Sequence, residues 1–367
     1  MARLGDLFLH VRNGANIKQG LDNTGYPITR IETISNRTVN RNKMGYAGIT
    51  DVSKYSDYIL QDGDILMSHI NSEIHLGKTA LYEKKDNEII IHGMNLLSLR
   101  PNKDLIDNKY AFYYLSSQAF LRQIPNITKK SVNQASFTVS ALKELDFSVT
   151  TIEEQKKVAN DLDKLNNLIE LRTQQLSKFD KLVKSRFVEM FGDKDYPEDT
   201  LLNLCNIIDY RGKTPEKVEY GLPFITAKNV KMHQMNLEPR EYISKETYDK
   251  VMVRGFPKEG DVLFTTEAPL GNVCRIPHFD TDFYIGQRIV TIQTENLEPI
   301  YLEYALSSDD FKMKYIGKSS GSTVTGIRVR LLEQLTIAVP PIDLQKEFAK
   351  FVEETDKLKL AIQQSLE

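Results

Sequence analysis

Two short stretches of the sequence resemble the end of a phosphate-binding loop. Gly77-Lys78-Thr79 and Gly212-Lys213-Thr214 each place a lysine and a hydroxyl group directly after a glycine. A nucleotide-binding loop also needs a glycine five residues before that glycine, because its backbone amides must wrap around the phosphates. Ser72 and Ile207 occupy those positions. The sequence therefore does not predict an NTPase.

Other catalytic arrangements are also missing from the sequence. Asp62 with Asp64, and Glu259 with Asp261, could act as paired carboxylates, but each pair precedes an apolar run, and we interpret both as solvated turns. The histidines show no ligand spacing and the 2 cysteines form no CxxC motif, so we expect no metal site and no disulfide framework. Neither a G-x-G-x-x-G motif nor the Asn/Asp-Pro-Pro-aromatic loop of amino-methyltransferases is present. We predict no catalytic residue, and a chain that is not an enzyme.

Polar loops suited to nucleic acid are the third kind of chemistry. Arginine and lysine suit guanine edges and phosphates, asparagine and glutamine suit adenine edges, and small hydroxyls allow close approach to phosphate. Lysine and hydroxyl runs begin at Thr128 and Lys318, the equivalent place in two halves of the chain. Any single residue of this kind could instead be an ordinary solvated loop side chain. The candidates are Arg30, Arg37, Arg41, Lys43, Ser68, Asn71, Lys78, Lys129, Lys130, Ser131 and Asn133 in the first half, and Lys213, Lys228, Asn229, Lys231, Thr265, Thr266, Arg288, Lys318, Ser319, Ser322, Thr323 and Arg328 in the second.

The overall composition limits how such binding could work. Lysine plus arginine number 48 against 50 aspartate plus glutamate, which gives a net charge of −2. The chain is therefore not a basic nucleic-acid coat, and positive charge must be local or supplied by a partner. With 41% hydrophobic and 27% charged residues, the chain has the composition of a globular protein. It has no signal-peptide core at its start and no long apolar run, so we expect a cytoplasmic protein.

The stretch 151–192, which separates the two halves of the chain, is predicted to be a single long helix. Thr151 is a helix-capping residue, and acidic residues follow it at the positive end of the helix dipole. Apolar residues then recur at steps of four and three, as on one seam of a coiled coil. About 40 residues at 1.5 Å each would make a rod of roughly 60 Å. The predicted seam residues are Val158, Leu162, Leu165, Ile169, Leu176, Phe179 and Val183.

The residues on either side of this stretch repeat one another. Both halves end in the same way, because Leu145, Phe147, Val149, Ile152 and Gln155 match Leu335, Ile337, Val339, Ile342 and Gln345 at a constant offset. The start of the long helix is thus repeated at 341–367, where Phe348, Val352 and Ile362 fall near the same seam. Earlier matches include Asp62-Gly63-Asp64-Ile65-Leu66 with Glu259-Gly260-Asp261-Val262-Leu263, and Tyr110 through Ser117 with Tyr301 through Ser308.

The repeat predicts an order of globule, helix, globule, helix. We place the globules at 1–150 and 193–340 and the helices at 151–192 and 341–367. Within each globule, apolar runs after turns predict strands, including 87–99, while 108–123 and 301–315 have helical spacing. The fold class is therefore α+β, with two mixed globules of ordinary domain size.

This order of motifs resembles the specificity subunit (S subunit) of type I restriction-modification systems. The resemblance rests on the Gly-Asp-Ile/Val-Leu and Leu-Ser-Ser motifs, the lysine-hydroxyl loops, and the duplicated helix starts Thr150-Thr151-Ile152-Glu153-Glu154-Gln155 and Pro340-Pro341-Ile342-Asp343-Leu344-Gln345. It covers nearly the whole chain. It implies that each globule is a target recognition domain for one half of a split, asymmetric DNA target, and that the two helices pack as an antiparallel coiled coil that spaces the domains.

The resemblance also implies partners and cofactors. Two methyltransferase subunits would dock on the helices and carry S-adenosylmethionine, and restriction subunits would join them for ATP-driven translocation, so this chain itself would bind no cofactor. Half-sites about one DNA turn apart, ~34 Å, would let two domains approach one face of double-stranded DNA. The alternative is a non-catalytic protein scaffold with two peptide-binding globules on a coiled-coil spacer.

Overall fold

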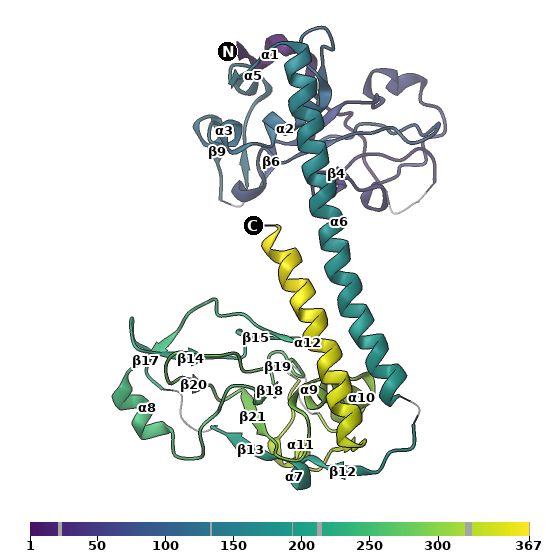
Figure 1. Ribbon diagram of the computed structural model, residues 1–367. Coiled ribbons are helices and arrows are strands. Elements are labelled where there is room, and N and C mark those ends of the chain that lie inside the picture. Colours follow the sequence, from purple (N-terminus) through teal and green to yellow (C-terminus); the bar gives the residue numbers. More distant parts are fainter. Residues whose placement is uncertain (21–23, 133, 193, 211–214, 320–324, 367) are drawn as a thin grey trace. The chain divides into compact units, whose positions relative to one another are not determined.

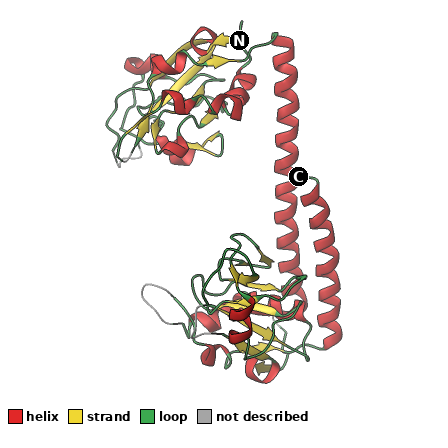
Figure 2. Cartoon of the chain, turned by 90° about the vertical axis from the view of Figure 1, so that its left-hand side faces the viewer, coloured by secondary structure: helices red, strands yellow, loops and turns green. Residues whose placement is uncertain are grey.

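The computed structural model describes residues 1–20, 24–132, 134–192, 194–210, 215–319 and 325–366 (Figure 1). The chain divides into two compact units, Met1–Glu170 (unit 1) and Leu171–Glu367 (unit 2). The long helix α6 (Ile152–Phe191) has 40 residues and contributes to both. Figure 2 shows strands and short helices mixed within each unit, in agreement with the predicted α+β class.

Unit 1 is built on a six-stranded sheet with the order β2-β8-β5-β7-β4-β3. The central strand β5 is buried at all four positions, because its sequence Ile-Leu-Met-Ser is a short apolar run. Neighbouring strands are antiparallel except for the parallel pair of β4 and β7. The strands are β2 (Phe8–Asn13), β3 (Ile34–Ser35), β4 (Thr38–Val39), β5 (Ile65–Ser68), β7 (Thr79–Leu81) and β8 (Leu96–Pro101).

Short helices and two small sheets cover this sheet and share its largest apolar core. One small sheet pairs β1 (Ala2–Arg3) with β11 (Asp146–Phe147), and the other has the order β6-β10-β9, with β6 at Ile70–Asn71, β10 at Ala135–Ser136 and β9 at Lys129–Lys130. The α-helices are α1 (Leu4–Leu7), α2 (Asn108–Leu115), α3 (Gln118–Leu121), α4 (Ile124–Ile127) and α5 (Val139–Lys143), and four 3-10 helices are η1 (Ile31–Thr33), η2 (Arg41–Lys43), η3 (Ser53–Tyr58) and η4 (Glu73–His75).

Unit 2 has a four-stranded antiparallel sheet, β13-β21-β18-β19, and three smaller sheets, β17-β14-β20, β12-β22 and β15-β16. Its strands are β12 (Glu198–Thr200), β13 (Asn206–Asp209), β14 (Leu222–Ile225), β15 (Val230–Lys231), β16 (Gln234–Met235), β17 (Tyr242–Ile243), β18 (Val262–Thr265), β19 (Val273–Arg275), β20 (Tyr284–Ile285), β21 (Ile289–Gln293) and β22 (Thr336–Ala338). Its helices are α7 (Leu201–Leu204), α8 (Lys245–Val251), α9 (Pro299–Ser307), α10 (Asp309–Ile316), α11 (Val329–Leu332) and α12 (Ile342–Gln364).

The tandem repeat predicted from the sequence is confirmed by the order of these elements. The sheet order β2-β8-β5-β7 of unit 1 returns as β13-β21-β18-β19 in unit 2. The helices α2 and α3 correspond to α9 and α10, and a short helix and a strand precede the long helix in each copy. The two copies therefore share one scaffold, on which the connecting loops differ.

The repeated glutamine at the start of each long helix has a structural role. Gln155 is fully buried, its side-chain oxygen accepts from the Asp107 N–H at 2.9 Å, and its amide group donates to the Thr150 carbonyl at 2.8 Å. Gln345 repeats this arrangement with the Glu298 N–H at 2.9 Å and the Pro340 carbonyl at 2.7 Å. Each glutamine thus ties the start of a long helix to the start of α2 or α9, because Asp107 and Glu298 are their cap residues.

Helix α12 packs antiparallel on the part of α6 that belongs to unit 2. Phe348, near the start of α12, contacts the rings of Phe187 and Phe191 near the end of α6, whereas Lys359 forms an ion pair with Asp180 at 2.7 Å, earlier in α6. Of the predicted seam residues, Val183, Phe348, Val352 and Ile362 are buried, Leu162, Leu176 and Phe179 are partly buried, and Val158, Leu165 and Ile169 are exposed.

The stretches 108–123 and 301–315 are helical, as their spacing predicts. Each is divided into two helices, at Ser117, whose hydroxyl accepts the Phe120 N–H, and at Ser308. Two local predictions were wrong. Of the predicted strand region 87–99, residues 87–95 lie outside β8, which begins at Leu96. Asp64, predicted in a solvated turn, is buried against Arg100.

Candidate nucleic-acid interface

The segment from the last residue of β5 to the first residue of β7, residues 68–79, brings several predicted residues of unit 1 together. It contains β6, which pairs with β10, and β10 pairs in turn with β9. Lys129 and Lys130 of β9 therefore lie one strand away from Asn71, on the same small sheet. The ammonium group of Lys130 lies 2.8 Å from a carboxylate oxygen of Glu73, in an ion pair that is largely exposed. This places two exposed lysines beside a segment that also contributes Lys78.

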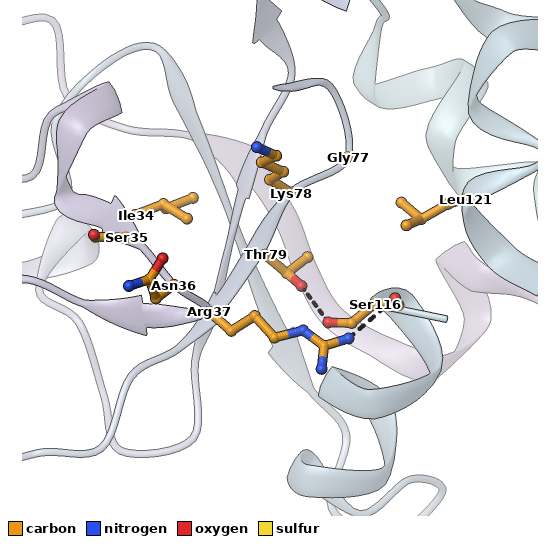
Figure 3. Close-up of a pocket in the computed structure, with 9 residues that line it drawn as sticks. All are labelled: Ile34, Ser35, Asn36, Arg37, Gly77, Lys78, Thr79, Ser116 and Leu121. Atoms are coloured by element: carbon orange, nitrogen blue, oxygen red, sulfur yellow. Dashed lines mark hydrogen bonds between the residues drawn. The ribbon is translucent and has the colours of Figure 1, made fainter. Parts of the chain in front are cut away.

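A cleft of about 400 Å³ opens beside the same segment (Figure 3). Its walls come from the β3–β4 turn, from the start of β7 and from the region around the α2–α3 junction. Among the predicted residues it contains Arg37 and Lys78. The hydroxyl groups of Ser35, Thr79 and Ser116 also line it and were not among the predicted DNA-binding residues, although Thr79 and Ser116 belong to the Gly-Lys-Thr and Leu-Ser-Ser motifs. The lining residues are Ile34, Ser35, Asn36, Arg37, Gly77, Lys78, Thr79, Ser116 and Leu121.

The remaining predicted residues of unit 1 differ in how exposed their polar groups are. Ser68 is buried, and its hydroxyl accepts from the Asn71 amide at 3.4 Å. Arg30 donates to the side chain of Gln19. Lys43 is exposed, and the Ser131 hydroxyl donates to the Gln134 carbonyl at 2.8 Å. None of these four residues lines the cleft.

Arg41 is held inside unit 1 by an acidic partner. Its Nε donates to Glu88 at 2.8 Å, its Nη2 donates to the second oxygen of the same carboxylate, and the guanidinium lies over the Tyr82 ring. The hydrogen bonds from Arg41 are the main reason that the pKa of Glu88 is lowered to about 2. The guanidinium of Arg41 is therefore engaged within unit 1.

This ion pair predicts a pH dependence of stability. Because the folded-state pKa of Glu88 lies below its ordinary value of 4.5, the pair stabilises the fold above about pH 4.5 and loses that contribution as the pH falls towards 2. Glu88→Gln should lower the free energy of unfolding at pH 7 by about 1–2 kcal/mol, and the difference from wild type should shrink below pH 4. Urea unfolding across pH 2–7 measures it, and a difference that stays constant with pH would contradict the assignment.

In unit 2, the segment that begins at the end of β18 corresponds to residues 68–79 of unit 1. Thr265 is buried, and its hydroxyl donates to the Pro269 carbonyl at 2.6 Å and accepts from the Asn272 N–H at 2.8 Å. Thr266 is also buried, and its backbone bonds the backbones of Arg288 and Ile327. Both threonines are thus parts of the framework. A cleft of about 340 Å³ lies beside them, and its lining residues are Ala268, Pro269, Leu270, Lys312, Tyr315, Ile316 and Thr325.

The cations of unit 2 are distributed around this framework. The Arg288 guanidinium forms an ion pair with Glu267 at 2.8 Å, and Arg328 and Lys318 are exposed. The Ser319 hydroxyl donates to the Ile316 carbonyl at 2.8 Å. Among these cations, Arg288 contacts the segment that corresponds to residues 68–79 of unit 1, through Glu267. Four predicted residues, Asn133, Lys213, Ser322 and Thr323, lie outside the described residues.

The last group of predicted residues lies in the β15–β16 hairpin and in the turn that precedes it. Lys228 and Lys231 are exposed, but Asn229 is buried, and its amide side chain bonds the Thr226 N–H and the carbonyls of Asn236 and Pro239. Asn229 therefore shapes the turn and has no exposed edge for a ligand. Within the described residues, no group of three or more histidine, cysteine, aspartate or glutamate side chains could hold a metal ion, and no helix of that part of the chain could cross a membrane.

Comparison with known proteins agrees with the repeated architecture. The type I restriction enzyme MjaX specificity subunit of Methanocaldococcus jannaschii is 33% identical over 379 residues, which cover 97% of this chain and 86% of that one. The MjaVIII specificity subunit of the same organism is 23% identical over 341 residues, or 82% of this chain and 74% of that one.

Solved structures show the same fold at low sequence identity. A crystal structure of a type I restriction-modification system S subunit from M. genitalium covers 99% of this chain and 91% of that one, with 16% identity and a TM-score of 0.58. A chain from a study of complex assembly in the type I R-M system covers 100% of this chain and 93% of that one, with 18% identity and a TM-score of 0.58. Finally, the family model of the type I restriction modification DNA specificity domain matches residues 1–179 and, a second time, residues 194–367. The chain therefore belongs to the family of type I restriction-modification DNA specificity domains, with two tandem copies of the domain.

Proposed function

We propose that this chain selects the DNA target of a type I restriction-modification complex, and that each globule recognises one half of a bipartite, asymmetric target. The observation that carries this proposal is the twofold match to a DNA specificity domain on a duplicated globule-helix architecture. The loops around the two clefts differ in sequence, which supports an asymmetric target. The peptide-binding scaffold considered from the sequence has no such support.

The chain itself acts by binding and performs no chemistry in this proposal. S-adenosylmethionine and ATP bind to partner subunits, which carry out methylation and translocation, and this chain needs no cofactor or metal. We expect the purified chain to leave DNA unmethylated and uncut when the two are incubated with Mg²⁺ and S-adenosylmethionine. Methylation or cleavage by the chain alone would overturn this part of the proposal.

Two methyltransferase subunits dock on the long helices in this proposal, and restriction subunits can join them. Apolar side chains on the outward faces support a protein partner there. In unit 2, Leu182 and Val188 of α6 are 48% and 52% exposed, and Leu358 and Leu360 of α12 are 55% and 54% exposed. Large apolar side chains gathered on helix surfaces are typical of protein interfaces.

Exchanging residues 1–150 for the corresponding globule of a relative tests whether each globule recognises one half-site independently. We expect the methylated target to change in one half-site only, because the second globule and the helices are untouched. Sequencing that detects methylated bases across the host genome measures both half-sites at once. A change in both halves, or in neither, would contradict two independent recognition domains.

A further inference from the structure

We propose that the cleft of unit 1 binds a backbone phosphate of the DNA, with Arg37 and Lys78 as its cationic ligands. This inference rests on the proposed function and names the chemistry of one contact within it. The cleft holds about 400 Å³, enough for a protruding phosphate with part of its sugar.

The charge of the cleft favours an anion. Two of its nine lining residues are cations, and no carboxylate is among them. Arg37 extends across the cleft, and its Nη2 donates to the Ser116 carbonyl at 3.2 Å (Figure 3). That neutral bond engages one of the five N–H groups of the guanidinium. The Lys78 ammonium contacts His75 Nδ1 at 2.6 Å. Within the described residues, neither Arg37 nor Lys78 forms an ion pair with a carboxylate.

Hydroxyl groups complete the donor set. The Thr79 and Ser116 hydroxyls lie 2.7 Å apart and bond each other between the two walls of the cleft. The hydroxyl that accepts this bond keeps its own hydrogen free to donate to a third group, because a hydroxyl is both donor and acceptor. An arginine fork, a lysine and small hydroxyls together form the usual recognition set for a phosphate.

The backbone that carries Arg37 is strained in a way that fits this role. Asn36 and Arg37 form the two-residue loop between β3 and β4, with φ values of 48° and 65°. Such loops favour glycine at the second position, because a side chain there crowds the backbone. An arginine at this position is held towards the cleft despite that cost, and strained residues of this kind concentrate at functional sites.

The shape of the site distinguishes a phosphate from a base. Base edges lie recessed in the grooves of a duplex, so a protein reads them with a projecting helix, strand or loop. Phosphates project from the duplex and can enter a concave surface. The cleft is concave and Arg37 lies across it, which suits the projecting group.

The test compares Arg37→Gly, Lys78→Ala and the double variant in the complex with its methyltransferase subunits. Arg37→Gly suits the left-handed turn, so a loss of binding cannot be attributed to misfolding of the loop. Affinity for a random-sequence duplex and for the mapped target is measured over a salt series. We expect each variant to bind both DNAs about 3–10-fold more weakly, and the slope of log K against log[salt] to shrink by about 0.9 for the lost phosphate.

Lys54→Ala, which removes an exposed lysine that does not line the cleft, is the matched control and should leave the slope unchanged. Unchanged affinity and slope in the double variant would remove the cleft from the DNA interface. A changed target preference would instead make Arg37 a base-reading residue and overturn the phosphate assignment. Failure of the wild-type complex to bind DNA would refute the proposed function itself, and is distinguishable from both of these outcomes.

Discussion

Asp64→Ala is expected to lower the free energy of unfolding of unit 1 by about 3–5 kcal/mol, the cost of breaking a buried ion pair. The Asp64 side chain is 1% exposed, and its oxygens accept from Arg100 Nε at 2.7 Å and Nη2 at 2.8 Å. It also accepts the Gln61 N–H at 2.8 Å. Removing the carboxylate would leave a guanidinium that is 19% exposed without its counter-charge, and a backbone donor without its acceptor.

Urea unfolding of the full chain, with hydrogen exchange to assign the change to unit 1, measures this effect. Asp62→Ala is the matched control, because Asp62 lies two residues away, is exposed, and accepts one bond from the Lys84 N–H. That variant should change the free energy by about 1 kcal/mol or less. A loss of the same size in both variants would show that the Arg100 pair contributes little to stability.

The corresponding residue of unit 2 has a different environment. Asp261 accepts from the Gln293 side-chain amide at 2.6 Å and from the Lys258 N–H at 2.8 Å, so its principal side-chain partner is neutral. Burial raises the pKa of Asp261, and its hydrogen bonds and the charge of Lys258 offset only part of that effect. The repeated Gly-Asp-Ile/Val-Leu motif therefore preserves the turn, while the charge balance around it differs between the units.

Glu303→Ala should be the second severe variant, with a loss of about 2–4 kcal/mol, somewhat below that of Asp64 because the guanidinium of Arg275 is more exposed than that of Arg100. The Glu303 side chain is 3% exposed and accepts from Arg275 Nε at 2.6 Å, and its other oxygen lies 2.8 Å from His233 Nδ1. The His233 ring also stacks on Tyr304, with the centroids 4.2 Å apart. His233 belongs to the turn of the β15–β16 hairpin, so the variant should loosen that hairpin as well.

Hydrogen exchange of residues 230–235 measures the loosening, and urea unfolding measures the loss of stability. Glu303→Gln keeps the shape but removes the charge, so it separates the ion pair from packing and should fall between wild type and Glu303→Ala. Glu295→Ala removes an exposed glutamate of the same unit and should be nearly neutral. Unchanged exchange in the hairpin would refute the link between Glu303 and His233.

The position of Glu303 is occupied by a different kind of side chain in unit 1. Aligned on the Leu-Ser-Ser motif, Glu303 of α9 corresponds to Phe112 of α2, which is buried in the apolar core of unit 1. A buried ion pair and apolar packing often give similar stability, but the loss of one partner of the ion pair is strongly destabilising. The hairpin that carries Lys231 is thus tied to α9 by the contact of His233 with Glu303, which has no counterpart at Phe112.

The sequence by itself determined the features that depend on local signals. The period of four and three predicted the long helix, and the Thr151 hydroxyl caps it by accepting the Glu154 N–H at 3.3 Å. The duplicated motifs predicted two copies of one scaffold, because glycines and buried glutamines must recur wherever the same turn and helix start recur. The same series of motifs was enough to indicate the family.

Only the tertiary structure decided which polar side chains remain available to a ligand. Arg41 and Asn229 have the right chemistry for DNA, yet Glu88, 47 residues away from Arg41, and the turn around Asn229 engage their polar groups. Asp64 was predicted to be solvated and is buried by Arg100. The cleft itself joins a turn, a strand and a helix junction that are distant in sequence. Helix periodicity and capping arise between near neighbours and can be read from the sequence, whereas burial and ion pairing depend on which distant segments the fold brings together.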